Sequence, residues 1–126
     1  MKKLLILLFS ILISFNIYGD WTFHAESSSG SKFYLDYETI RKNSGYVYYW
    51  ELVDYEKVNN YGNMSLAAYY QGDCGIFRIN RLTIISYSQS MGTGASEEFN
   101  YEPDWQSAPP GTIRENTLNI VCDYVN

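Results

Sequence analysis

The chain has 126 residues and a formal charge of −5 at neutral pH, because 14 acidic residues outnumber nine basic ones. This length suits a single domain. The basic residues form no cluster, so the sequence argues against a nucleic-acid partner, which needs lysines and arginines on one face.

The chain begins with the pattern of a cleaved secretory signal peptide over residues 1–19. Two lysines precede an almost unbroken apolar run from Leu4 to Ile13, and the residues after it become more polar. A membrane anchor is the alternative, but it needs about 20 apolar residues and this run is shorter. Cleavage after Gly19 leaves one domain, residues 20–126, without a membrane span. No cysteine lies at the junction, so we expect a periplasmic or cell-surface protein without a lipid anchor.

Alternating apolar and polar residues predict a hairpin at the start of the mature chain. Residues 21–26 place Phe23 and Ala25 on one side of a strand, so His24 is expected to face solvent without a functional role. A Ser-rich turn follows, and residues 32–36 resume the alternation. The polar residues after this hairpin predict one helical turn.

The next strand is predicted over residues 46–55, which are rich in aromatic and β-branched residues. It is apolar on both faces, which favours a place in the middle of a sheet. One face carries Tyr48, Trp50 and Leu52, and the other carries Val47, Tyr49, Val53 and Tyr55.

Two further strands are predicted over residues 64–71 and 76–87. The second changes its phase, and a β-bulge near Asn80 and Arg81 would bring its apolar residues to one face. Residues 88–98 contain two glycines and are expected to form a flexible loop.

The last predicted element is an amphipathic helix from Thr112 to Cys122. Thr112 and Glu115 have the spacing of a capping box, directly after a Pro-Pro-Gly break. The apolar stripe of this helix predicts that it packs on the sheet.

The only cysteines, Cys74 and Cys122, are predicted to form a disulfide, because exported chains usually pair two such cysteines. A redox or metal pair is the alternative, but the chain has neither a CxxC motif nor a His-Cys cluster. The predicted fold class is therefore α+β: an antiparallel sheet of five or six strands with a C-terminal helix packed on it and tethered by the disulfide.

No motif in the chain indicates catalysis. One histidine cannot make an HExxH zinc site, and residues 92–94 lack the rest of a nucleotide-binding fingerprint. Acidic pairs such as Glu51 and Asp54, or Glu97 and Glu98, have no context that favours glycosidase chemistry. We therefore expect a non-enzymatic protein with no cofactor and no metal.

The aromatic content favours a binding surface. Twelve tyrosines and three tryptophans in residues 20–126 exceed what a small domain buries entirely, because each of these rings carries a polar atom that needs a partner. Cross-strand aromatic pairs are one explanation, and a protein-binding face is the other. One short helix covers only part of a sheet face, so we expect exposed aromatic rings that bind a protein or a second copy of the chain. The candidates are Tyr49 and Tyr55, rimmed by Glu51, with Trp50 and Leu52 facing the helix.

Several motifs together resemble one known family. They are Trp21, the segments 33–36 and 39–41, the segment 50–55, Cys74 with Arg78, Tyr87 with 91–94, Trp105, the segment 109–112 and Val121-Cys122. In order and spacing they resemble the surface-adhesin protein E family of Gram-negative bacteria, over nearly the whole mature chain. The resemblance implies an antiparallel sheet with a tethered helix, and an exported protein that in the best-known members is an adhesin for host extracellular-matrix proteins. It transfers no catalytic or binding residue.

The sequence features and the family resemblance leave two alternative functions. One is an exported non-enzymatic binding protein that acts as a surface adhesin. The other is a periplasmic accessory or stress protein that binds an envelope protein or a small hydrophobic ligand. One departure from the family matters, because the adhesin resembles a lipoprotein and this chain has no cysteine at its signal junction.

Overall fold

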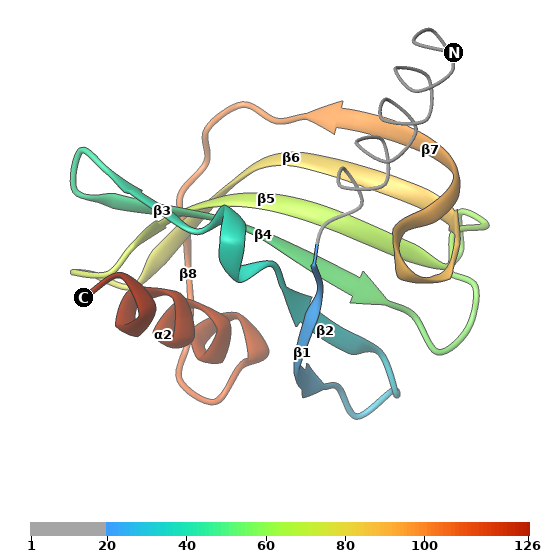
Figure 1. Cartoon of the computed structure of the whole chain (residues 1–126), viewed down its shortest axis with the longest axis horizontal. Helices are drawn as coiled ribbons and strands as arrows, with labels where there is room; N and C mark the ends of the chain where they lie inside the picture. The colour runs from blue at the N-terminus through green and yellow to red at the C-terminus, as the bar shows by residue number, and fades with distance from the viewer. Residues whose placement is uncertain (1–19) are drawn as a thin grey trace, which may run out of the picture.

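The computed structural model describes residues 20–126, which form an antiparallel β-sheet with a C-terminal helix (Figure 1). The predicted signal peptide, residues 1–19, lies outside the described residues. Six strands follow the path β1-β2-β4-β5-β6-β7, and two short strands, β3 and β8, pair beside it with β4 and β6. The bounds are β1 Thr22–Glu26, β2 Lys32–Leu35, β3 Arg41–Asn43, β4 Tyr46–Asp54, β5 Ser65–Asp73, β6 Arg78–Gln89, β7 Thr93–Asn100 and β8 Gln106–Ser107.

The predicted fold class is confirmed. The six strands of the main path agree with the expected number, and each neighbouring pair in the sheet is antiparallel. A 3-10 turn at Tyr37–Thr39 matches the predicted helical turn, and the side chain of Asp36 accepts a hydrogen bond from the amide of Glu38 at its start.

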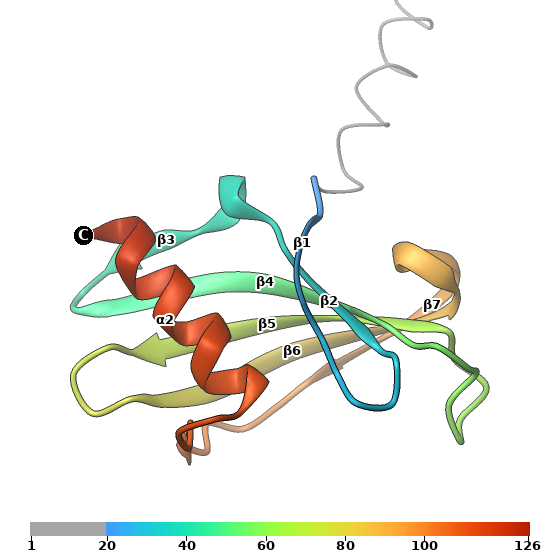
Figure 2. The same cartoon turned by 90° about the horizontal axis from the view of Figure 1, so that it is seen from below.

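Helix α2 (Ile113–Val125) crosses one face of the sheet (Figure 2). The Thr112 hydroxyl accepts the amide of Glu115 at 3.1 Å, as the capping motif predicted, and the helix continues one turn beyond the expected end. Cys74, in the turn between β5 and β6, is bonded to Cys122 with 6.0 Å between the Cα atoms. We call the face under α2 the inner face and the opposite one the outer face.

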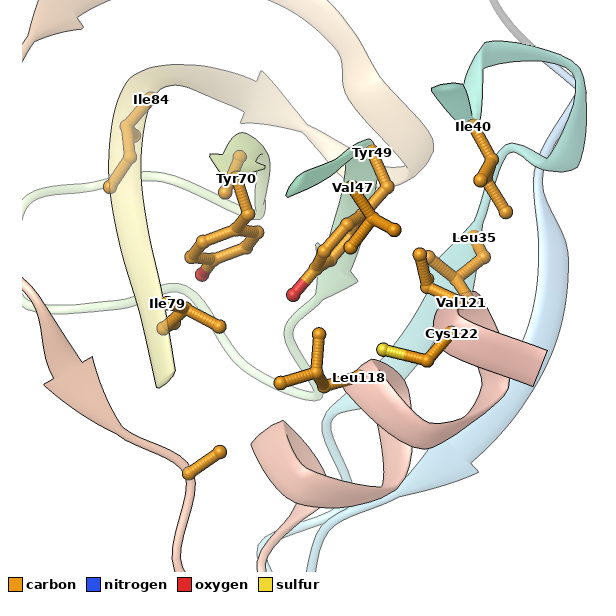
Figure 3. Packing of buried hydrophobic residues seen from close by; sticks show 12 residues of the cluster. Leu35, Ile40, Val47, Tyr49, Tyr70, Ile79, Ile84, Leu118, Val121 and Cys122 are labelled. Atoms are coloured by element: carbon orange, nitrogen blue, oxygen red, sulfur yellow. The ribbon is translucent and has the colours of Figure 1, made fainter. Parts of the chain in front are cut away.

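The core lies between α2 and the inner face. Tyr49 and Tyr70, on neighbouring strands, lie side by side with ring centroids 5.4 Å apart, and Leu118 of α2 faces them (Figure 3). Gly72 permits this close approach, because a Cβ at that position would lie 2.6 Å from the Cδ1 of Leu118. Helix and sheet therefore bury one continuous apolar cluster, which the disulfide closes at its end.

The predicted bulge in β6 is confirmed. The register with β5 passes from Thr83 directly to Arg81, so Leu82 is the extra residue. Ile79 pairs with Gly72 and Ile84 pairs with Ala68, and both isoleucines are buried on the inner face.

The prediction that residues 88–98 form a flexible loop is wrong. A tight turn at Ser90–Gly92 reverses the chain, helped by positive φ angles at Met91 and Gly92. The chain then returns as β7 and pairs with β6 along the sheet edge. Glycine and serine in this stretch therefore serve a turn and an exposed edge strand.

Candidate functional site

The outer face carries a row of aromatic rings on strands β4 and β5. Trp50 is the register partner of Tyr69, and their ring centroids are 5.0 Å apart. Tyr48, two residues before Trp50 and therefore on the same face, stacks on Tyr69 at 6.2 Å. The outer aromatic face consists of Phe23, which is exposed, and of six partly exposed residues: Tyr34, Tyr46, Tyr48, Trp50, Tyr69 and Trp105.

The central rings are held in place by their neighbours. The side-chain amide of Gln71 donates to the Tyr48 hydroxyl at 3.1 Å, and Asn80 donates to the Oε1 of Gln71 at 2.9 Å. Burial raises the pKa of Tyr69, Tyr48 raises it further, and the nearby Arg41 opposes the shift. A surface that is ordered before binding loses less side-chain entropy when a partner arrives.

Further aromatic residues continue the row at both of its ends. At one end Trp105 packs on Tyr46 at 5.4 Å, and the Arg78 guanidinium lies 4.1 Å from the Trp105 ring centroid. At the other end Phe23, which is 52% exposed, meets Tyr34 edge-on at 5.8 Å. Tyrosine, tryptophan and arginine are the residues that most often dominate binding energy in protein interfaces.

The predicted binding residues lie on the other face. Tyr49 is only 1% exposed and Glu51 only 6%, so the expectation that they form an exposed rim is wrong, and Tyr55 is half-buried. The pleat of β4 directs Tyr49 and Glu51 toward α2, while Trp50 points to the outer face. The prediction of partly exposed rings on the sheet face away from the helix was correct. The prediction of which side chains of β4 lie on that face was wrong.

Leu52 shows the same error. It was expected to pack against the helix, yet it is buried on the outer side, where the turn at Ser90–Gly92 contacts β4 and β5. Because both faces of β4 are apolar, the hydrophobic pattern alone could not show which face lies against α2. The one signal in the sequence is Gly72, because a glycine beside a strand often marks the close approach of another element, and the structure places α2 there.

His24 was expected to face solvent, and this is wrong. A bulge in β1 between Phe23 and Ala25 turns the His24 side chain inward, so only 4% of it is exposed. Its Nε2–H donates to the Oε2 of Glu51 at 3.2 Å, and the Thr117 hydroxyl donates to the same oxygen at 2.8 Å. This cluster joins β1, β4 and α2, which explains how a carboxylate is accommodated at the helix contact.

The inner face also contains a hollow of about 600 Å³ beside the start of α2. Apolar side chains of β2, β4, β5 and β6 form most of its floor, and α2 forms one wall. Its polar lining comes from Glu51, Thr117, Arg81 and Arg114, together with the two core tyrosines. Tyr49, Glu51 and Tyr55, the residues predicted to form a binding face, all line this hollow.

The charges around the hollow act on its tyrosines. Burial raises the pKa of Tyr49 well above its ordinary value, Glu51 adds to this shift, and Arg114 opposes it. Within residues 20–126, no three His, Cys, Asp or Glu side chains lie close enough to hold a metal ion. None of the helices in the described part is long and apolar enough to span a membrane.

Comparison with known proteins identifies the family. No curated protein sequence matches the chain. Two structures of Haemophilus influenzae protein E are similar to this chain. One has a TM-score of 0.64 and 19% identity over 75% of this chain and 83% of that one. The other has a TM-score of 0.60 and 20% identity over 72% and 76%.

A third structure, protein E from non-typeable Haemophilus influenzae, has a TM-score of 0.58 and 18% identity over 82% of this chain and 84% of that one. At these identities the structures establish the shared fold. The family model described as surface-adhesin protein E matches residues 21–123, which is most of the sequence. The chain therefore belongs to the surface-adhesin protein E family.

Proposed function

We propose that this protein is an exported, non-enzymatic adhesin that binds protein partners, host extracellular-matrix proteins among them, through its outer aromatic face. The observation that carries the proposal is the ordered row of Tyr48, Tyr69 and Trp50, which is stacked and only partly covered by other parts of residues 20–126. Family membership supports the adhesin function and export.

Protein interfaces gain most of their binding energy from a few large, well-packed side chains. Large aromatic rings contribute apolar area without requiring much side-chain entropy, and their polar atoms remain available to a partner. Here the rings are already fixed by stacking and by the Gln71 hydrogen bond, so little ordering remains to be done on binding. Arg41 and Arg78 lie beside the aromatic row, and Arg78 is paired with Asp73 at 3.1 Å, so the rim carries charges of both signs and Glu51 is not part of it.

Self-association through the same face is a second use of this surface. A homodimer would bring two copies of the aromatic row together in a symmetric contact. The alternative function, a periplasmic accessory protein that binds an envelope protein or a small hydrophobic ligand, is favoured by one observation, which is the hollow on the inner face.

Two measurements separate these functions. Protease shaving of intact cells should cleave a surface adhesin, whereas release only after osmotic shock would favour the periplasmic function. Binding of the purified protein to immobilised extracellular-matrix glycoproteins and to envelope extract should then be measured in parallel by biolayer interferometry, with light scattering for the oligomeric state.

The decisive variant is Trp50→Ser/Tyr69→Ser, which removes the centre of the outer aromatic face. We expect a loss of at least tenfold in affinity for a matrix partner, because removal of central aromatic anchors has large effects. The matched control is Tyr61→Ser, since Tyr61 is 88% exposed in the loop between β4 and β5. If the folded double variant binds as well as the wild type, the outer face is not the binding surface.

A further inference from the structure

The hollow on the inner face has two chemically different ends. The sheet register places Tyr49, Tyr70 and Arg81 in one row across β4, β5 and β6, close to Arg114 at the start of α2. Val53 and Leu66 form a second row about 13 Å farther along the strands, at about 3.3 Å per residue. The hollow therefore runs from a cationic end to an apolar end.

The cationic end is not neutralised by the protein. The Nε of Arg81 is buried and has no hydrogen-bond partner within residues 20–126. Arg114 donates to the carbonyl oxygen of Ser107 at 3.2 Å, a neutral acceptor. Both arginines are close enough to lower the pKa of Tyr70 against the opposite effects of burial and Glu51. The rest of the Arg81 guanidinium interacts with neutral groups, the Tyr70 hydroxyl and the Tyr101 ring, whose centroid lies 5.8 Å from Cζ. A buried N–H donor without a partner is costly, and an anion would satisfy it.

Glu51 does not supply that anion. Its Oε2 already accepts hydrogen bonds from Thr117 at 2.8 Å and from His24 at 3.2 Å. Glu51 pairs with Ala68, one row away from the row of Arg81, on a strand that is not adjacent to β6. Two arginines and one carboxylate leave the hollow with one excess positive charge, which matches a ligand with a single negative charge.

The size of the hollow matches a small molecule. Its volume of about 600 Å³ falls within the range of about 300 to 1,000 Å³ that is typical of ligand pockets. Arginine binds carboxylates through paired N–H groups in one plane, which favours a carboxylate head. The apolar floor formed by Val53, Leu66 and Ile84 favours an unbranched aliphatic body.

We propose that this hollow binds a small amphiphilic carboxylate, whose head group lies between Arg81 and Arg114 and whose aliphatic chain lies along Val53, Leu66 and Ile84. The site lies on the opposite face of the sheet from the outer aromatic face. The residues that line the hollow are not part of the outer aromatic face, so separate variants can test the two sites.

The experiment uses the exported, disulfide-bonded protein and three probes at the same pH. Decanoate carries both features of the proposed ligand, decanol carries only the chain, and acetate carries only the head group. Isothermal titration calorimetry gives the affinities, and amide chemical shifts in ¹⁵N-labelled protein locate the site. We expect saturable decanoate binding at least tenfold tighter than that of either control, with the largest shifts in residues that line the hollow.

Two charge variants test the head-group contact. Arg81→Met keeps the apolar stem and should weaken decanoate at least tenfold while leaving decanol unchanged. Lys42→Met removes one positive charge from the exposed strand β3, outside the hollow, and should change neither affinity. The site assignment is overturned if decanol binds as tightly as decanoate, if Arg81→Met binds decanoate normally, or if the shifts lie on the outer face. The absence of saturable decanoate binding by the folded wild type also overturns it.

Discussion

The close approach of α2 to the sheet at Gly72 predicts a specific destabilisation. Gly72 is buried on β5, and a Cβ there would lie 2.6 Å from the Cδ1 of Leu118 and 2.9 Å from the Cγ2 of Val47. Both distances are shorter than ordinary carbon contacts, so helix or strand must shift in Gly72→Ala. Overpacking of this kind costs about 1 to 3 kcal/mol of unfolding free energy.

A double-mutant cycle assigns this cost to the helix contact. Leu118 is fully buried, so Leu118→Ala alone should cost about 2 to 5 kcal/mol through the cavity that it leaves. In Gly72→Ala/Leu118→Ala the new methyl group occupies space that the leucine vacated. The double variant should therefore be more stable than the sum of the single effects by about 1 kcal/mol.

Urea unfolding of the oxidised protein, followed by far-ultraviolet circular dichroism, measures all four free energies. Gly75→Ala is the matched control, because Gly75 is exposed in the next turn and its added Cβ would approach only the Oδ1 of Asp73. This control should stay within about 0.5 kcal/mol of the wild type. The packing described for α2 is refuted if Gly72→Ala is equally neutral, or if its effect adds to that of Leu118→Ala without coupling.

Three further predictions follow from the disulfide, the buried carboxylate and the buried tyrosines. Thiol titration of the unfolded, unreduced protein should find no free thiol, and Cys74→Ser/Cys122→Ser should lower stability by about 2 to 5 kcal/mol, since the bridge closes a separation of 48 residues. Thr117→Val should cost about 1 to 3 kcal/mol in urea unfolding and Thr117→Ser much less, because only valine removes the hydroxyl that donates to Glu51. Burial raises the pKa of Tyr49 and Tyr70, so their contribution to stability is fully present below the ordinary tyrosine pKa of about 10 and is lost as the pH rises above it. Urea midpoints measured across this pH range should fall, and Tyr49→Phe should flatten the decline. A midpoint that stays constant across the range would contradict the burial of both rings.

Features that depend on a few neighbouring residues were predictable from the sequence. Thr112 caps α2 because its hydroxyl reaches the amide three residues later, which is a local geometry. The bulge in β6 follows from a change of phase in the hydrophobic pattern, and the structure places it at Leu82, beside the predicted position. The disulfide follows from export and from the presence of only two cysteines.

Features that depend on long-range packing were not predictable in the same way. The two apolar faces of β4 differ only in what covers them. This depends on α2, which begins 59 residues after β4 ends. His24 lies on an alternating segment, but the bulge in β1 appears only when β1 pairs with β2. The cationic end of the hollow consists of Arg81 on a strand and Arg114 on a helix, and no local pattern in the sequence connects these two residues.

The central claim is that a protein partner binds at the outer aromatic face, and hydroxyl-radical footprinting tests it most directly. Side-chain oxidation should be compared by mass spectrometry in the free protein and in its complex with a matrix glycoprotein. We predict that oxidation of Phe23, Trp50 and Tyr69 falls on binding, while oxidation of Tyr61 and Tyr124, which are exposed elsewhere, does not change. Protection confined to Tyr61, Tyr124 or the hollow, with Trp50 and Tyr69 oxidised as fast as in the free protein, would contradict the claim.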